Sequence, residues 1–440
     1  MRRLLAGLTL FALLIPAAAW ATPYDTFGTG ARSIGMGMAY GAVGGDASAM
    51  HYNPATIVKA STFQLEFGYR VGDIALEMND RQSDIDQDRG FTLGVVIGKT
   101  LLARQFRIGV NVYTPDDHFM RFYLPQRTAP VFLRYTNINH MQATITGGAF
   151  EIVPDIWSIG FGSSFVSSNT GGVDFLLSED EGARGNLVTR LASKATPVIG
   201  TYVEPLEWLH FGLTYREKRE QSLGLPNRID LGNLKVFKDN GIIVFQEGLE
   251  ILQVNSSTHF SPRQINLAMA VEPNDSFIWS LDATHYKYSE MKSNVAFSVA
   301  NLTGDLGQVL PSDPPLLIPE PKTHDVWGVA TGVEYKAIDN PKFQLHTRAG
   351  YNFRPTPVAE QTDVSNLLDS DTHIIGAGLG FTFADFSEVF PAPITLDIFN
   401  QFHYMEERTM RKHDPTNDFG DVKIGGYANS IGATFILRFN

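Results

Sequence analysis

Hydrophobic and polar residues alternate through short segments of this 440-residue chain, from about residue 62 to the C-terminal end. In the last segment, one face carries the apolar residues Ile431, Ala433, Phe435, Leu437 and Phe439. The intervening positions are more polar and include Ser430, Thr434 and Arg438. Successive side chains of a strand point to opposite faces of a sheet, so strict alternation predicts β-strands. The pattern therefore predicts an all-β protein.

The length of the alternating segments favours a membrane barrel over a β-sandwich or another large soluble β fold. The segments run for about 9–12 residues, as tilted membrane-spanning strands do, whereas strands of soluble proteins usually have about 5–6. Aromatic residues near the segment ends are typical of the interfacial girdles of outer-membrane barrels. These aromatic residues are Tyr69, Tyr113, Trp157, Trp208, Tyr215, Trp279, Tyr335, Tyr351, Phe402 and Tyr404.

About fifteen segments are candidate strands, and single-chain bacterial barrels usually have an even number. Segment 228–237 has the weakest pattern, and fourteen strands remain if it belongs to a loop. We therefore predict a transmembrane antiparallel β-barrel of about 14 strands. The candidate segments are 62–77, 91–100, 106–114, 136–152, 156–167, 196–204, 209–219, 228–237, 263–271, 276–288, 326–335, 343–351, 374–383, 394–405 and 429–439.

Connections between the predicted strands are alternately short and long. We expect the short turns at Pro154-Asp155, Pro205–Glu207 and Pro273–Asp275 to lie on the periplasmic side. Outer-membrane barrels have their longer loops on the extracellular side. We therefore expect extracellular loops in the long polar stretches 115–135, 168–195, 220–261, 289–325 and 406–428.

The first 61 residues do not alternate and divide into two parts. Residues 1–21 have a positive start, a short apolar core and an Ala19-Trp20-Ala21 cleavage site, which is the layout of a secretory signal peptide. Residues 22–61 are rich in glycine and other small residues, which permit close backbone approach. A barrel of about 14 strands would otherwise enclose a water-filled hole. We therefore expect residues 22–61 to form a plug inside a barrel of residues 62–440.

Composition excludes several classes of function. The formal net charge of −12 argues against a nucleic-acid partner, because binding to phosphates requires basic patches. The chain has no cysteine, which excludes a disulfide framework and a cysteine metal site. No segment after residue 21 reaches the roughly 18 continuous apolar residues of a membrane helix.

The chain is similar to the FadL/TodX (OMPP1) family of outer-membrane transporters for hydrophobic compounds. In the predicted plug, the similarity rests on residues 35–39, Gly-Met-Gly-Met-Ala, and on residues 46–55, which end in Asn53-Pro54-Ala55. Residues 109–115 resemble the third strand of the family and the turn after it. The similarity continues through residues 155–162, 261–289 and 348–358, in the order and spacing of the family.

This resemblance implies a plugged fourteen-stranded barrel with an apolar pocket in the lumen. It also implies that the substrate leaves sideways, through a gap in the wall at a kink in the third strand. The residues implied for the moving plug are Gly35, Gly37, Asn53, Pro54 and Ala55. The residues implied for the wall near the lateral exit are Val110, Tyr113, Pro115 and Asp117.

The resemblance does not decide whether the cargo carries a carboxylate. Family members that carry fatty acids hold the carboxylate with arginine or lysine in the lumen. By alternation Arg348 should face inward, which makes it a polar candidate in the lumen. Lumen arginines also form structural ion pairs, since lumens are normally polar. A neutral hydrocarbon and a fatty acid therefore both remain open.

No enzyme motif appears in the sequence. The glycines at 35, 37 and 41 lack the preceding strand, spacing and acidic residue of a dinucleotide loop. We expect no catalytic residue, no cofactor and no metal. Three functions remain open: a passive channel for small hydrophobic molecules, a FadL-like barrel that binds or shuttles secreted envelope proteins, and a general porin. We expect a monomer in the Gram-negative outer membrane, in contact with lipid, lipopolysaccharide and a hydrophobic substrate.

Overall fold

The computed structural model describes most of the chain after the predicted signal peptide, which lies outside the described residues. The described residues are 23–117, 130–136, 142–178, 182–238, 241–292, 297–303, 320–361, 366–384, 392–412 and 420–439. None of the helices in these ranges has the length and hydropathy of a transmembrane segment.

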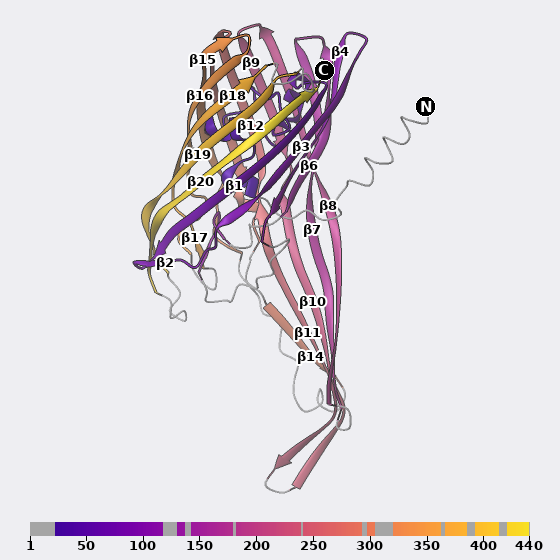
Figure 1. Ribbon diagram of the computed structural model, residues 1–440. Coiled ribbons are helices and arrows are strands. Elements are labelled where there is room, and N and C mark those ends of the chain that lie inside the picture. The colour runs from indigo at the N-terminus through magenta and orange to yellow at the C-terminus, as the bar shows by residue number, and fades with distance from the viewer. Residues whose placement is uncertain are drawn as a thin grey trace, which may run out of the picture.

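Fourteen strands form a closed antiparallel ring, which confirms the predicted fold class (Figure 1). The ring closes between its first and last strands, which pair from Phe63 with Phe439 to Met78 with Ile424 without a register shift. In chain order the wall strands are β1 (Phe63–Met78), β3 (Asp88–Leu101), β4 (Arg104–Pro115), β6 (Ala143–Val153), β7 (Trp157–Ser178), β8 (Gly182–Leu206), β9 (Leu209–Arg216), β12 (Arg263–Asn274), β13 (Phe277–Lys287), β15 (Val326–Asn340), β16 (Phe343–Arg354), β18 (Thr372–Phe383), β19 (Ile394–Met410) and β20 (Val422–Phe439).

The wall has its apolar side outward and its polar side inward. In β20, Ile431 is 53% exposed and Phe435 is 38% exposed, whereas Ser430 and Thr434 are buried in the interior. A soluble protein has the opposite arrangement, because its apolar face covers the core. The apolar residues of the alternating pattern therefore form the outer, lipid-facing side of a barrel.

The aromatic residues predicted for the girdles do not all point outward. Trp157, Trp208 and Tyr335 are exposed near the short turns. Tyr113 is fully buried, and its hydroxyl donates a hydrogen bond to Asp88 inside the barrel. The girdle prediction is therefore wrong for Tyr113, because it occupies an inward position of β4.

Tight turns join the wall strands at one end of the barrel, here called the short-turn end. They include the turns between β6 and β7 at 154–156, between β8 and β9 at 207–208, and between β12 and β13 at 275–276. The first contains the predicted turn at Pro154-Asp155, and the other two overlap the predicted turns at Pro205–Glu207 and Pro273–Asp275, whose prolines belong to strands. The other end carries the longer connections and is called the long-connection end. It includes β2 (Arg81–Gln82), η3 (Tyr288–Glu290) and a parallel pair of β5 (Val131–Phe132) with β17 (Leu367–Leu368).

The prediction of loops at 168–195 and 220–261 is wrong, because both stretches form long strands. β7 and β8 stay paired as far as Ser178 with Gly182, and β10 (Arg219–Lys238) and β11 (Gly241–Ser261) form a second hairpin, which contains segment 228–237. β10 runs parallel to β7, and β14 (Phe297–Thr303) pairs with β11. This sheet projects far beyond the ring (Figure 1). Its polar sequence resembled a loop because a strand outside lipid has no need of an apolar face.

Much of the predicted loop at 406–428 is also strand. β19 continues to Met410, and β20 begins at Val422. Stretches 115–135 and 289–325 are described only in part, and they contain β5 and β14 respectively.

The segment from residue 23 to residue 61, here called the N-terminal segment, lies inside the ring. It consists of short helices, α2 (Pro23–Phe27), α3 (Ala31–Gly35), α4 (Ala49–Tyr52) and η1 (Pro54–Lys59). Nearly all of its residues are buried. Residues with positive φ separate the helices, among them Gly30 at +79° and Gly37 at +66°. Such angles favour glycine, which explains part of the glycine content of this segment.

Candidate functional site

The Asn-Pro-Ala motif joins the N-terminal segment to the wall at β7 and β8. The Asn53 amide donates to the Gly41 carbonyl at 2.8 Å and to the Thr201 carbonyl at 3.1 Å. Its side-chain oxygen accepts the Ala55 N–H at 3.1 Å and caps η1, in which Pro54 takes the first position. The Ser158 hydroxyl donates to the Ala55 carbonyl at 3.0 Å. Asn53 thus organises the motif and holds it to the wall at once.

Wall glycines make room for this contact. A Cβ atom on Gly160 would lie 2.3 Å from the Ala55 nitrogen, and one on Gly200 would lie 2.0 Å from the Asn53 side-chain oxygen. Both distances are shorter than any tolerable contact, so the motif fits only against a wall that lacks side chains at these positions. The backbones of the N-terminal segment and the wall are in direct contact here.

The predicted plug glycines pack in a similar way against the opposite part of the wall. A Cβ atom on Gly37 would lie 2.6 Å from the Tyr351 nitrogen in β16, and one on Gly350 would lie 2.1 Å from the Gly37 nitrogen. A Cβ atom on Gly35 would lie 3.1 Å from the Gly378 Cα in β18. Glycines on both sides therefore permit close backbone approach.

A chain of charged groups connects the N-terminal segment to β15, β16 and β19. Arg32 donates to both carboxylate oxygens of Glu334, at 2.8 and 2.9 Å. Arg348 also donates to Glu334, and at 2.6 Å to Asp397. Glu334, Arg348 and Asp397 are all buried. The structure thus places Arg348 in the lumen, as a member of an ion-pair chain that includes the N-terminal segment.

A second polar network lies where the N-terminal segment meets β1, β3 and β4. Arg70 donates to Asp88 at 2.9 Å and to the Gly28 carbonyl at 2.9 Å. Tyr113 donates to the other Asp88 oxygen at 2.6 Å, and Tyr24 donates to Asn111. These contacts fasten α2 and the turn after it to the wall.

The residues predicted for the lateral exit lie along β4. Val110 faces outward and is half-buried, Tyr113 and Pro115 are buried, and Asp117 is exposed beyond the strand. β4 pairs with β3 as far as Pro115, but its pairing with β6 ends at Tyr113 with Ala143. The described ladder has no register shift before that point. The wall beside Val110 is therefore continuous, and within the described residues the pairing of β4 with β6 stops at Tyr113.

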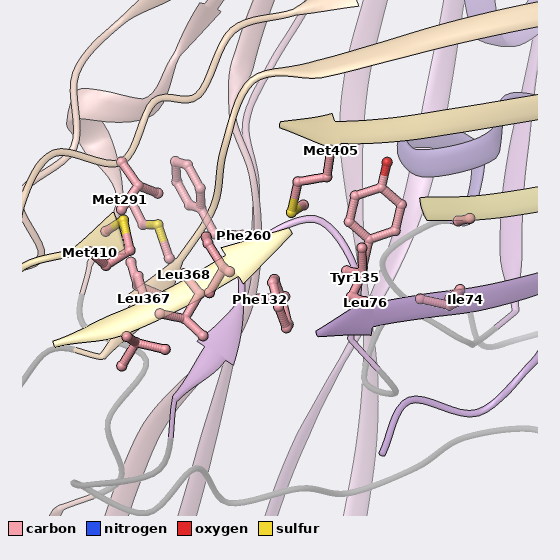
Figure 2. Packing of buried hydrophobic residues seen from close by; sticks show 14 of the residues in the cluster. Ile74, Leu76, Phe132, Tyr135, Phe260, Met291, Leu367, Leu368, Met405 and Met410 are labelled. Carbon is pink, nitrogen blue, oxygen red and sulfur yellow. The ribbon is translucent and has the colours of Figure 1, made fainter. Parts of the chain in front are cut away.

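Buried apolar side chains gather at the long-connection end, in a group here called the loop-end cluster (Figure 2). It brings wall residues together with β5, β17 and the loops, and it includes three methionines. Phe27 of the N-terminal segment belongs to it, and its ring centroid lies 6.4 Å from that of Tyr135. The members are Phe27, Ile74, Leu76, Phe132, Tyr135, Phe260, Met291, Val358, Leu367, Leu368, Met405, Met410, Val422, Ile424 and Ala428.

A cavity of about 110 Å³ lies between α2, α4 and the inner face of β9, β12, β13, β15 and β16. Its lining mixes polar and apolar groups, with Arg216 and Arg354 among the polar ones and Phe260 shared with the loop-end cluster. His51 lines it as well. Burial, and then the charge of Arg216, holds the pKa of His51 well below its usual range. His51 is therefore neutral at physiological pH.

In the described part of the chain, no group of histidine and acidic residues has the geometry of a metal site. The sequence analysis did not predict the ion pairs inside the lumen. Glu334 and Asp397 are charged residues at inward positions of strongly alternating strands. Charge at such positions was the signal that could have identified them, because an unpaired charge inside a narrow, filled lumen is costly.

A closed barrel with an apolar exterior, a lumen filled by its own N-terminal segment and an apolar cluster at one end defines a plugged outer-membrane β-barrel. The family model described as outer membrane protein transport protein (OMPP1/FadL/TodX) matches residues 13–439, and the chain belongs to this family. Members of this family are transport channels of the Gram-negative outer membrane and take up hydrophobic compounds.

Solved structures with this fold cover almost the whole chain. A FadL homologue from Pseudomonas aeruginosa is 15% identical with a TM-score of 0.55, over 96% of this chain and 98% of the homologue. The toluene transporter TbuX from Ralstonia pickettii is 14% identical with a TM-score of 0.53, over 95% of this chain and 100% of TbuX. The toluene transporter TodX from Pseudomonas putida is 12% identical with a TM-score of 0.52, over 94% of this chain and 100% of TodX. A comparison with curated proteins finds no match.

Proposed function

We propose that this chain is a passive channel for small hydrophobic molecules in the outer membrane. In this proposal residues 1–21 are a signal peptide that is removed, residues 22–61 are the plug, and residues 62–440 form the barrel. The long-connection end faces outward, and the short turns face the periplasm. The observation that carries the proposal is Phe27, through which the loop-end cluster is in direct contact with the N-terminal segment.

The loop-end cluster supports an apolar cargo. An apolar solute gains about 25 cal/mol for each Å² that it removes from water, so it favours a chain of apolar contacts over a water-filled pore. Met291, Met405 and Met410 are flexible side chains that repack around different shapes. A molecule that enters the cluster arrives at Phe27 and so at the plug.

For the exit we propose the wall near Val110, Tyr113, Pro115 and Asp117. Among the described residues, pairing between β4 and β6 ends at Tyr113, so this part of the third wall strand has the fewest described hydrogen bonds to break. An exit into lipid keeps an apolar cargo out of water. Movement of the segment around Gly35, Gly37 and Asn53-Pro54-Ala55 would open the route.

Uptake by whole cells tests this function. The chain is expressed in a Gram-negative host that lacks its own family members, and the entry of radiolabelled toluene, an alkane and a fatty acid is measured. Leu368→Asp places a charge in the loop-end cluster and should abolish uptake. Leu102→Asp, at a turn residue that is 97% exposed, is the matched control and should have no effect. Equal uptake with and without the protein for all three compounds would refute the proposal.

The second candidate is a barrel that binds or shuttles secreted envelope proteins. The sheet beyond the ring favours it, because among the described residues β14 pairs with β11 alone and so has an open edge. Open strand edges accept a strand from a partner. A specific secreted protein that co-purifies with the full chain, together with unchanged uptake in the absence of the chain, would favour this function over a channel.

A further inference from the structure

Three arginines surround α2 beside the cavity; Arg216 and Arg219 are buried and Arg354 is half-buried. Arg216 donates to Asp25, to Gln264 at 3.1 Å and to the His51 carbonyl. Arg219 donates to the same carboxylate. Arg354 donates at 2.6 Å to the Asp25 carbonyl, not to its carboxylate. One short helix of the N-terminal segment is thus held from several sides of the barrel.

The charges of this group do not balance. Within the described residues, the Asp25 carboxylate lies within 4 Å of the guanidinium nitrogens of Arg216 and Arg219. No described carboxylate lies within that distance of the Arg354 guanidinium. Arg216 is 6% exposed and Arg219 is 2% exposed. Three positive charges therefore share one carboxylate, and water hardly reaches two of the three arginines. Such an excess attracts a further anion, because desolvated charges interact strongly.

Unused donors show where that anion would bind. The Nε–H groups of Arg216, Arg219 and Arg354 are buried and have no hydrogen-bond partner among the described residues. A buried donor without a partner costs about 1–3 kcal/mol. Arg216, Arg354 and Asp25 all line the cavity, so a ligand in the cavity reaches both the spare donors and the carboxylate that already occupies the arginines.

We propose that Asp25 is an internal substitute for a ligand carboxylate, and that a cargo carboxylate exchanges with it on Arg216 and Arg219. The exchange releases α2 from the wall of the barrel. It needs no energy source, since one ion pair replaces another. An amphipathic cargo with one carboxylate thereby loosens the N-terminal end of the plug, whereas a neutral cargo of the same length does not. This inference rests on the proposed channel function and assigns the substrate class at the same cavity.

Binding of a matched pair of ligands tests the exchange. The full chain is placed in lipid nanodiscs, and hexanoate and hexanol are titrated calorimetrically with empty nanodiscs as the blank. Asp25→Asn removes the internal competitor and should raise hexanoate affinity about tenfold, with hexanol affinity unchanged. Arg216→Gln should lower hexanoate affinity about tenfold. Arg107→Gln, a buried arginine that donates to the Ala60 carbonyl at the other end of the segment, is the control and should affect neither ligand.

Release of α2 has its own readout. The chain lacks cysteine, so Thr26→Cys provides a single thiol in α2 for maleimide labelling. Hexanoate should increase the labelling rate, and hexanol should not. Equal rates with the two ligands would overturn the exchange.

The remaining outcomes separate the possible explanations. Equal effects of Asp25→Asn on hexanoate and hexanol would overturn this inference and leave the channel function intact. Displacement of hexanoate by acetate at equal concentration would show a site for small free anions, and would overturn the assignment to cargo. Failure of hexanol, hexanoate and toluene alike to bind would overturn the proposed function and this inference with it.

Discussion

Replacing Glu334 by glutamine should weaken the attachment of the N-terminal segment to the wall without unfolding the barrel. Glu334 is 4% exposed and accepts hydrogen bonds from Arg32 and Arg348. Removing one partner of a buried ion pair costs about 3–5 kcal/mol. Arg348 keeps Asp397, and the glutamine oxygen still accepts one hydrogen bond, so the lower end, about 3 kcal/mol, is expected. Arg32 loses its carboxylate partner. The substitution should therefore mainly reduce the free energy that holds the N-terminal segment against the wall.

Thiol labelling measures that loss. Ala31 is 1% exposed, and Ala31→Cys is the single thiol of the chain in wild-type and Glu334→Gln backgrounds alike. When opening is faster than labelling, the labelling rate follows the population of the open form. A change of about 3 kcal/mol corresponds to roughly a hundredfold faster labelling.

The control is Glu406→Gln on the outer surface. Glu406 is paired with His373 at 2.7 Å, and both side chains are substantially exposed. Exposed pairs contribute about 0–1 kcal/mol, so the labelling rate should change by less than about fivefold. If Glu334→Gln labels at the wild-type rate while the barrel stays folded, as judged by its heat-modifiable mobility on gels, the ion-pair chain does not hold the segment.

Further substitutions test the packing, the wall and the motion of the segment. Gly350→Val should disrupt the contact between the segment and the wall and raise ion conductance in planar bilayers above that of the wild type. An unchanged conductance would contradict the close packing. Phe161→Arg, at an outward position that is 56% exposed, should lower the free energy of unfolding in lipid vesicles by about 2–4 kcal/mol. Leu102→Arg, at a turn, should leave that free energy unchanged. A disulfide between Ala31→Cys and Thr434→Cys, two positions joined by a 3.2 Å hydrogen bond, should stop uptake until it is reduced, and normal uptake in the oxidised form would show that the segment stays in place there.

The wall was predictable because lipid imposes a strict pattern on every strand that crosses it. Segment 394–405, for example, falls within β19, which runs from Ile394 to Met410. The predicted segment 429–439 begins later than β20, which starts at Val422. Gly425 and Gly426 interrupt the alternation there, and Gly426 has a φ of +124°. Outside lipid the pattern disappears, so the strands beyond the ring looked like loops.

The contacts inside the lumen depend on residues that are far apart in the chain. Arg32 and Glu334 are separated by 302 positions, and Asp25 and Arg219 by 194. Periodicity places a residue inside or outside the barrel, but it does not say which inward residues face each other across the lumen. That choice depends on the register of fourteen strands and on the path of the N-terminal segment, and one sequence does not fix either.

The two ends of the N-terminal segment are held by different kinds of interaction, and this difference indicates where motion begins. Around Asn53, backbone lies directly against Gly160 and Gly200, so withdrawal would lose close packing over the whole contact and leave a cavity. Around Asp25, the contacts are hydrogen bonds and ion pairs to long arginine side chains beside a cavity, and another polar group can replace them one at a time. Replacement keeps Arg216 and Arg219 paired with a carboxylate, whereas separation of packed backbones has no such intermediate. Opening of the lumen should therefore start at α2, before the Asn-Pro-Ala motif moves.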